Sequence, residues 1–221
     1  MPVAKPILVN DIIENHLAAI GGRECLIKIS NRIYEGTLKG QGLKGKIRSI
    51  AKDPDKYYQL VDFGTRRQET GFDGVTGWKK DQNVFRILAG EELEQARESA
   101  ARNKLMRYQD PNLFSRILLI GQEQIGGREA YAIEFTNRRG SVVVSYYDAE
   151  TFLELKNVRE VHIKSEKIKM EVFNEDYRMV DGLILPFKVR QITSVNQVEV
   201  IIDSYRFNTE IDDQIFKTPP H

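Results

Sequence analysis

Residues whose types could do chemistry occur in three groups along the chain, and their spacing decides what each group can do. The first group is Gly40 to Gly45, which reads G-x-G-x-x-G. This pattern binds dinucleotide phosphates when a helix begins inside it, because the amides at the helix N-terminus hold the pyrophosphate. The following residues, Lys46 to Ile50, alternate polar and apolar side chains and predict a strand. We therefore interpret the glycines as a hairpin turn.

The second group is the titratable side chains, which match no catalytic or metal-binding spacing. Two pairs of adjacent carboxylates, Glu175–Asp176 and Asp212–Asp213, lie beside expected turns. Neighbours on a strand point to opposite faces, so neither pair converges on one reacting group as a general acid and base must. The histidines fit no ligand pattern such as H-E-x-x-H; they are His16, His162 and His221. We expect no enzyme activity, no metal site and no cofactor.

The third group makes the expected hairpin basic, since Lys44, Lys46 and Arg48 follow its turn. These side chains suit contact with an anionic lipid headgroup or with an acidic partner protein. The alternative is a solvated edge hairpin whose lysines prevent pairing with another strand. The sequence leaves both interpretations open.

The composition limits the classes of protein that are compatible with this chain. Its 221 residues include 33 basic and 32 acidic side chains, a net charge of +1, so a nucleic-acid partner is not expected. No apolar run approaches the roughly 20 residues of a membrane helix, and no transmembrane segment is expected. The single cysteine, Cys25, excludes an intramolecular disulfide. The apolar run Ile7–Val9 is too short for a signal peptide, so none is expected in this chain.

Many short strands and few helices are predicted to build the molecule. Asp11 can cap a first helix that ends at Gly21, and a polar helix is expected from Ala89 to Lys104. Runs of alternating or apolar residues separated by short turns predict an antiparallel sheet of about ten strands. We expect an α+β protein with a single domain over residues 11–221 and an N-terminal extension over residues 1–10.

The strands contain more large apolar side chains than two helical regions can cover. Such a sheet either packs into a sandwich or curls into an open half-barrel with an apolar hollow, and the periodicity fits both. The residues expected to line the hollow and bind a ligand are Tyr58, Leu60, Trp78, Phe85, Ile133, Phe135, Val144, Tyr146, Leu185 and Phe187.

Six segments of the chain have a distinctive order and spacing. They are IIENHLAAIGGRECLIKISNRIYEGTL, FDGVTGW, GREAYAIEF, YYDAETFLEL, DYRMVDGLILPFKV and DQIFKTP. Together they resemble the outer-membrane lipoprotein-sorting family, the LolA/LolB-like proteins, and in particular its divergent members. The similarity extends from about Asp11 to Pro219 and consists of strand ends and turns rather than catalytic motifs.

The resemblance implies a strongly curved antiparallel sheet around an apolar cavity, with helices as a lid. In the best-studied family members this cavity holds the acyl chains of a lipoprotein during transfer across the periplasm. The resemblance therefore implies a non-enzymatic periplasmic carrier or binder of a lipoprotein acyl chain or another lipid. The alternative is an envelope interaction module with a filled interior, which binds a protein partner through an edge strand or the basic hairpin.

Overall fold

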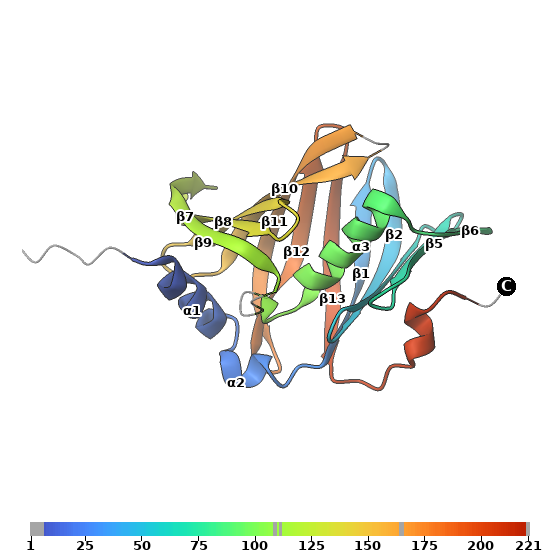
Figure 1. Cartoon of the computed structure of the whole chain (residues 1–221), viewed down its shortest axis with the longest axis horizontal. Helices are drawn as coiled ribbons and strands as arrows, with labels where there is room; N and C mark the ends of the chain where they lie inside the picture. The colour runs from blue at the N-terminus through green and yellow to red at the C-terminus, as the bar shows by residue number, and fades with distance from the viewer. Residues whose placement is uncertain (1–6, 108–109, 111, 164–165, 220–221) are drawn as a thin grey trace, which may run out of the picture.

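The computed structural model of the protein describes residues 7–107, 110, 112–163 and 166–219 (Figure 1). Residues 1–6 of the predicted extension, His221 and the side chain of His162 lie outside the described residues. The helices are α1 (Val9–Ala19), α2 (Arg23–Leu26), α3 (Gly90–Asn103) and the short 3-10 helix η2 (Asp213–Phe216). No helix in the described ranges is both long and apolar enough to cross a membrane.

Thirteen strands in the described part of the chain form one antiparallel sheet, in the order β6-β5-β4-β3-β2-β1-β13-β12-β11-β10-β9-β8-β7. The sequence predicted about ten strands, slightly fewer than the sheet contains. Polar or charged residues fill most positions of β4, so this strand lacks the apolar alternation that marks a half-buried strand. The bounds are β1 (Asn31–Gly40), β2 (Leu43–Lys52), β3 (Lys56–Asp62), β4 (Arg67–Phe72), β5 (Gly77–Asp81), β6 (Val84–Ile87), β7 (Phe114–Ile125), β8 (Arg128–Asn137), β9 (Val142–Asp148), β10 (Glu154–Ile163), β11 (Glu166–Val180), β12 (Leu183–Thr193) and β13 (Gln197–Phe207).

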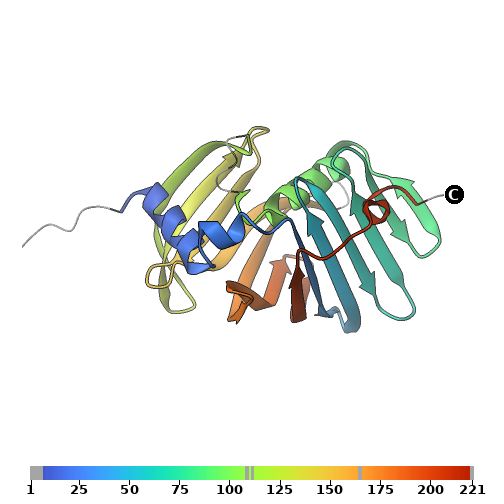
Figure 2. The ribbon, with the colours of Figure 1, turned by 90° about the horizontal axis from the view of Figure 1, so that it is seen from below.

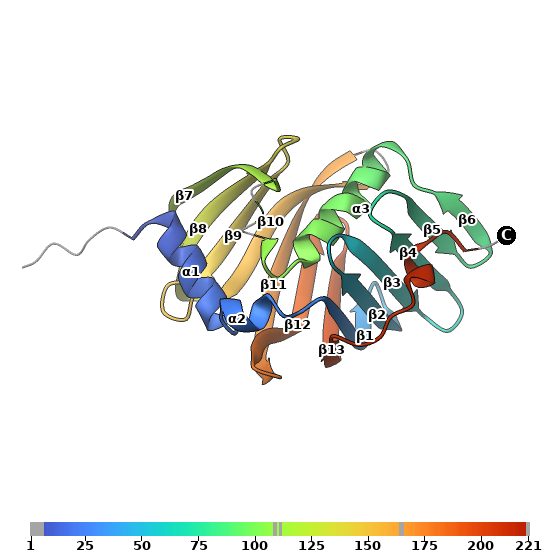
Figure 3. The same cartoon turned by 60° about the horizontal axis from the view of Figure 1, so that its bottom comes forward.

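Nearly all of the sheet consists of hairpins between strands that are consecutive in the sequence. One series comprises β1 to β6 and the other comprises β7 to β13, and the pairing of β1 with β13 joins them. The register shifts at this junction, between Glu35 and Gly36, and also within the β7–β8 and β9–β10 pairs. Such bulges increase the local twist. The sheet curves into an open half-barrel (Figures 1 and 3), which confirms the predicted fold class.

The helices and the C-terminal segment cover opposite faces of the sheet. On the inner face, α1 buries Leu17 in a cluster with Ile133, and α3 buries Ala100 beside Phe72. Figure 2 shows α3 on one side of β1 to β5 and the C-terminal segment on the other. We call the face under α1 and α3 the inner face and the opposite one the outer face.

The C-terminal segment is fixed to the outer face by one aromatic side chain and one carboxylate. Phe216 is fully buried in a cluster with Tyr58 and Trp78. The Trp78 indole Nε1 donates a hydrogen bond to the carbonyl oxygen of Phe216 over 2.9 Å. The ammonium group of Lys52 lies 2.7 Å from the Asp213 carboxylate. Apolar burial and these polar contacts together hold the chain end on the strands.

Two local predictions are wrong. The first helix begins at Val9 rather than after Asp11, and Asp11 accepts a hydrogen bond from the Leu8 backbone at 3.1 Å from within the first turn. An acidic side chain in the first turn also stabilises the helix dipole, so its presence does not fix the first residue. Glu175 and Asp176 lie inside β11 rather than beside a turn, where Glu175 forms an ion pair with Arg190 at 2.6 Å.

The hairpin interpretation of the glycine-rich segment is confirmed. β1 ends at Gly40 and β2 begins at Leu43, and the two turn residues, Gln41 and Gly42, have φ angles of 49° and 75°. Positive φ at both positions is the conformation of a two-residue hairpin turn. The alternative of an edge hairpin is wrong, however, because β2 lies between β1 and β3 while β6 and β7 form the edges.

Candidate ligand-binding cavity

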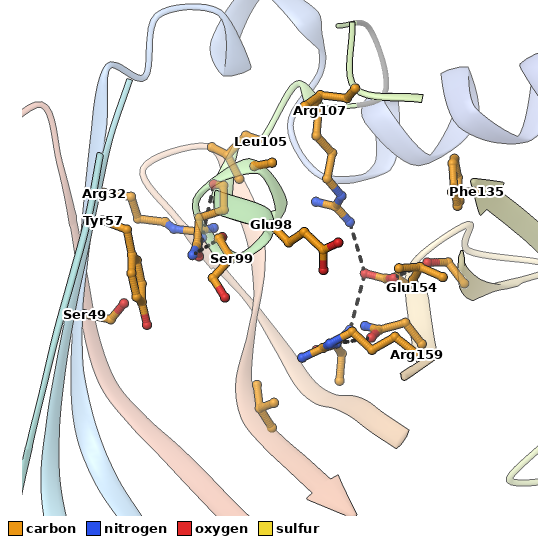
Figure 4. A pocket seen from close by; sticks show the side chains of 18 of the residues that line it. Arg32, Ser49, Tyr57, Glu98, Ser99, Leu105, Arg107, Phe135, Glu154 and Arg159 are labelled. Carbon is orange, nitrogen blue, oxygen red and sulfur yellow. Dashed lines mark hydrogen bonds and ion pairs between the residues drawn. The ribbon is translucent and has the colours of Figure 1, made fainter. Parts of the chain in front are cut away.

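A cavity of about 620 Å³ lies on the inner face of the sheet, beside α3 (Figure 4). Its lining includes residues of α3 and of strands on both sides of the β1–β13 junction. Figure 3 shows α3 crossing this face of the curved sheet. Sites for small molecules typically have volumes of about 300–1,000 Å³, so the space is sufficient for a ligand.

Apolar side chains form one part of the lining. Leu185 and Phe135 are buried, and the rings of Phe114 and Phe135 lie 5.1 Å apart. Eight of the apolar lining residues form what we call the apolar floor: Ile20, Leu105, Phe114, Phe135, Leu185, Val189, Val200 and Ile202. A hydrocarbon chain placed against these side chains would leave water, and its burial is favourable in proportion to its apolar area.

A buried carboxylate, Glu154, marks one polar wall of the cavity. Its oxygens accept hydrogen bonds from the Ser145 hydroxyl at 2.7 Å and from the Asn174 amide at 3.5 Å. The guanidinium of Arg107 lies 3.4 Å away, and Figure 4 shows it reaching down to this carboxylate. A buried carboxylate needs this combination of a counter-charge and hydrogen bonds. Glu154 is therefore electrostatically compensated within the protein.

His16 lies at the same side of the cavity and is uncharged. The side chain is 4% exposed, and Nδ1 lies 2.9 Å from the carbonyl oxygen of Phe152. The carbonyl can only accept, so Nδ1 carries the proton and Nε2 does not. Burial lowers the pKa of His16 to about 4, although the negative charge of Glu154 acts in the opposite direction. The imidazole is therefore a neutral part of the wall at physiological pH.

The opposite wall contains an arginine, Arg32, beside two tyrosines. Arg32 is partly buried, and its Nη2 atom donates to the Asn103 side-chain oxygen at 3.1 Å and to the Asn103 carbonyl at 3.5 Å. Burial raises the pKa of the Tyr34 hydroxyl, which hydrogen bonds with Ser49. Burial likewise raises the pKa of Tyr205, whose hydroxyl donates to the carbonyl oxygen of Pro186 at 2.7 Å. These hydroxyls stay protonated and can donate hydrogen bonds.

Polar contacts attach α3 to the turn between β8 and β9. The Glu98 carboxylate accepts hydrogen bonds from the Asn137 amide at 3.0 Å and from the Ser141 hydroxyl at 2.7 Å. Glu94, one turn earlier, forms an ion pair with Arg139. On its other side, α3 is held by apolar packing of its alanines against β4. α3 therefore links the two series of strands across the cavity.

The structure places four of the ten predicted ligand residues at the cavity or directly beside it. Phe135 and Leu185 line the cavity. Ile133 and Phe187 do not line it but belong to the same buried apolar cluster. These four residues lie on the inner face of β8 and β12.

The other six predicted residues lie on the outer face. Tyr58, Leu60, Trp78 and Phe85 form a cluster with Phe216 beneath the C-terminal segment, and Val144 and Tyr146 pack with Ala132 and Leu155. Their neighbours of opposite parity, Tyr57, Val143 and Ser145 among them, line the cavity instead. We therefore do not include these six residues in the proposed ligand site.

The basic residues of the first hairpin also lie away from the cavity. Lys44 and Lys46 are exposed, and the guanidinium of Arg48 lies 3.4 Å from the carboxylate of Glu35. Lys46 lies 3.9 Å from the carboxylate of Asp203. Contact with a headgroup or a partner therefore stays a prediction for the outer face.

Sequence reasoning missed the polar residues of the cavity. Arg32 alternates with the buried Ile33, which is the pattern of a solvent-facing residue, and Glu154 follows a turn. Both residues lie on the inner face because their buried neighbours, Ile33 and Leu155, belong to clusters on the outer face. In the described part of the chain, no three histidine, cysteine, aspartate or glutamate side chains are grouped so that they could hold a metal ion.

Comparison with known proteins gives the fold of this chain. No family model and no curated protein matches its sequence. A LolA superfamily protein from Nitrosomonas europaea superposes with a TM-score of 0.63 at 10% identity, over 96% of this chain and 99% of the other. A DUF1329 family protein from Desulfovibrio piger gives 0.60 at 15% identity, over 95% and 97%.

A third similar structure is a Vibrio parahaemolyticus domain named for outer-membrane lipoprotein sorting. Its TM-score is 0.56 at 14% identity, over 93% of this chain and 94% of that domain. All three superpositions extend over nearly the whole of both chains. The protein therefore has a LolA-like fold, as the resemblance of its sequence segments implied. At identities of 10–15%, these superpositions show the architecture alone. The ligand has to be inferred from the cavity.

Proposed function

We propose that the protein is a non-enzymatic carrier or binder that holds the acyl chain of a lipoprotein, or another lipid, in the cavity beside α3. The observation that supports this most directly is an interior space of about 620 Å³ whose lining combines an apolar floor with polar walls. Such a lining suits an amphiphile, because the chain and the polar group each find matching surface. A filled interior, which the interaction-module alternative requires, is disfavoured by the same space.

Similarity of fold supports the same proposal. The similar structures include a LolA superfamily protein and a domain named for outer-membrane lipoprotein sorting. We propose on this basis that the protein acts in the periplasm of the bacterial envelope, with a lipid or lipoprotein as its main partner. No covalent step is needed for such a role.

The expected affinity is sufficient for a carrier. Each buried methylene contributes about 0.8 kcal/mol, so a chain of about fourteen carbons gives on the order of 10 kcal/mol before costs. Loss of translational and rotational freedom opposes binding by several kcal/mol. The difference corresponds to dissociation constants on the order of micromolar, which allow both uptake and release.

Native mass spectrometry of protein purified without detergent, together with analysis of its organic extract, tests the proposal. We expect co-purified lipid, or uptake of a fluorescent fatty acid by the empty protein. Val189→Phe narrows the cavity and should weaken uptake at least about tenfold, because the added ring occupies the chain's space. The matched control, Val84→Phe, adds the same ring at a side chain that is 69% exposed on β6.

Two results would contradict the proposal. The first is a protein that is empty and takes up no fatty acid, which would favour the interaction module. The second is equal uptake by both phenylalanine variants, which would place the bound chain outside the cavity.

A further inference from the structure

The charged side chains that line the cavity are mostly cationic. Six arginines face three glutamates, whereas the whole chain has a net charge of only +1. The arginines are Arg32, Arg97, Arg107, Arg138, Arg139 and Arg159, and the glutamates are Glu94, Glu98 and Glu154. Charges of one sign around a hollow with low-dielectric walls produce a potential that attracts a ligand of the opposite sign.

The three glutamates already have partners inside the protein. Glu154 lies 3.4 Å from Arg107, and Glu94 contacts both Arg97, at 2.9 Å, and Arg139. Glu98 accepts hydrogen bonds from the turn between β8 and β9. None of these carboxylates forms an ion pair with Arg32 in the described part of the chain.

Arg32 is therefore a partly buried charge without a carboxylate in the described structure. Hydrogen bonds from Arg32 to described residues leave from Nη2 alone and end on the neutral Asn103. A guanidinium has five N–H donors, so most of its donor capacity is unused. Burial lowers the pKa of Arg32, the interactions with Tyr205 and Tyr34 oppose this change, and the positive charge of Arg107 adds to it. A buried charge without a counter-charge destabilises the folded protein.

A structural role at the end of α3 accounts for only part of this arrangement. Asn103 is the last residue of α3, and the C-terminus of a helix carries a partial negative charge equivalent to roughly half an electron. That partial charge orients Arg32 but does not neutralise it. The guanidinium is therefore only partly compensated, and Arg32 lines the cavity together with Tyr34.

We propose that the cavity binds an anionic amphiphile, whose carboxylate or phosphate group pairs with the Arg32 guanidinium while its chain lies on the apolar floor. The planar fork of an arginine matches both oxyanions, because it can donate two parallel hydrogen bonds. The Tyr34 hydroxyl, on the same strand and the same wall, is a further donor near this group. The inference rests on the proposed function and specifies which lipids are preferred.

The test compares three ligands of one chain length: a fatty acid, its uncharged methyl ester and the 1-acylglycerol 3-phosphate. Each displaces the neutral fluorescent probe N-phenyl-1-naphthylamine from the full chain at pH 7.5. We expect the ester to bind at least about tenfold more weakly than one of the two anions. Preference for the fatty acid assigns a carboxylate ligand, and preference for the glycerol phosphate assigns a phospholipid headgroup.

Arg32→Gln is expected to weaken binding of the preferred anion by about 10- to 100-fold and to leave the ester within about threefold. Arg206→Gln removes the same charge on the outer face, where Arg206 is half-exposed and pairs with Glu35, and should change neither affinity. If Arg32→Gln does not fold, the wild-type protein still gives an answer. An increase in salt concentration should then lower the affinity for the anion and leave the affinity for the ester unchanged.

Several outcomes would overturn the inference while leaving the carrier proposal intact. Equal affinities for anions and ester in the wild type would show that the charge of the ligand does not affect binding in the cavity. An equal loss for anion and ester in Arg32→Gln would show that Arg32 only anchors α3. If salt changed the affinities for anion and ester equally, this would likewise show that charge does not contribute to binding in the cavity. Failure of all three ligands to displace the probe would instead contradict the proposed function itself.

Discussion

The buried imidazole of His16 makes the stability of the protein depend on pH. Its pKa of about 4 in the folded state lies below the ordinary value of 6.5, mainly because of burial. Between these two values the unfolded chain binds a proton that the folded chain does not. The free energy of unfolding therefore falls as the pH drops from 6.5 towards 4, and above pH 6.5 this contribution is constant.

The expected loss from His16 between pH 7.5 and pH 5 is about 2 kcal/mol. His16→Gln keeps a donor for the Phe152 carbonyl and removes the titration, so the unfolding free energy of the variant should change less over this interval. Denaturant unfolding of both proteins at the two pH values measures the difference. The same pH dependence in wild type and variant would contradict a neutral, buried His16.

Individual side chains show why the cavity was only partly predictable. In the segment Val142–Tyr147, both parities contain large or apolar residues, so alternation alone could not decide which set faces inward. The structure selects Val143 and Ser145 for the cavity. On β8, in contrast, Ile133 and Phe135 alternate with the polar Glu134, and their inward orientation followed from the pattern.

At the scale of elements, the C-terminal segment explains a second group of misplaced residues. Tyr58 and Trp78 are large and aromatic. Because no segment was expected to cover the outer face, these side chains were predicted to lie on the inner face. Phe216 supplies that cover from a distant part of the sequence. Such a long-range contact leaves no local signal beside β3 or β5, whereas the strands themselves have local signals and were predicted.

Phe216→Ala is expected to lower the free energy of unfolding by about 3–5 kcal/mol, because it empties a fully buried site. The emission of Trp78, the single tryptophan of the chain, should shift to longer wavelength as its cover loosens. Lys217→Ala, at the exposed neighbouring residue, is the control. Unchanged stability and emission in Phe216→Ala would mean that the segment is not docked in solution.

The attachment of α3 gives a separate prediction. Asn137→Ala combined with Ser141→Ala removes the hydrogen bonds to Glu98, each of which contributes about 0.5–3 kcal/mol. Amide hydrogen exchange over residues 90–103 should then be at least about tenfold faster, while exchange in β12 stays the same. Ser115→Ala is the matched control, since Ser115 bonds to the backbone of β8 and not to α3. Equal exchange in both variants would contradict this attachment.

For the whole molecule, the β1–β13 junction is the single strand pairing in the described sheet that joins its two series. At this bulge Gly36 approaches its partner closely, and an added Cβ would lie 2.3 Å from the carbonyl oxygen of Ile201. Gly36→Ala should therefore lower the free energy of unfolding by about 1–3 kcal/mol or more. Thr37→Ala, the next residue on β1, should have a smaller effect.

Unfolding followed by Trp78 fluorescence reports on the first series, and circular dichroism reports on the entire sheet. Both probes should show the lower free energy of unfolding of Gly36→Ala. Wild-type stability in this variant would contradict the close approach of the two strands. The half-barrel itself was predicted from the sequence only through the family resemblance, because the amount of curvature arises from bulges such as this one.

The order of strands also has a consequence for synthesis on the ribosome. β1 comprises residues 31–40, but β13, its partner at the junction, comprises residues 197–207 and is synthesised much later. At a synthesis rate of about 5–20 residues per second, one hydrogen-bonding edge of β1 has no partner strand for on the order of ten seconds. During that interval the nascent chain exposes a ten-residue strand margin that another polypeptide can pair with, so this margin is where a chaperone would protect the emerging protein.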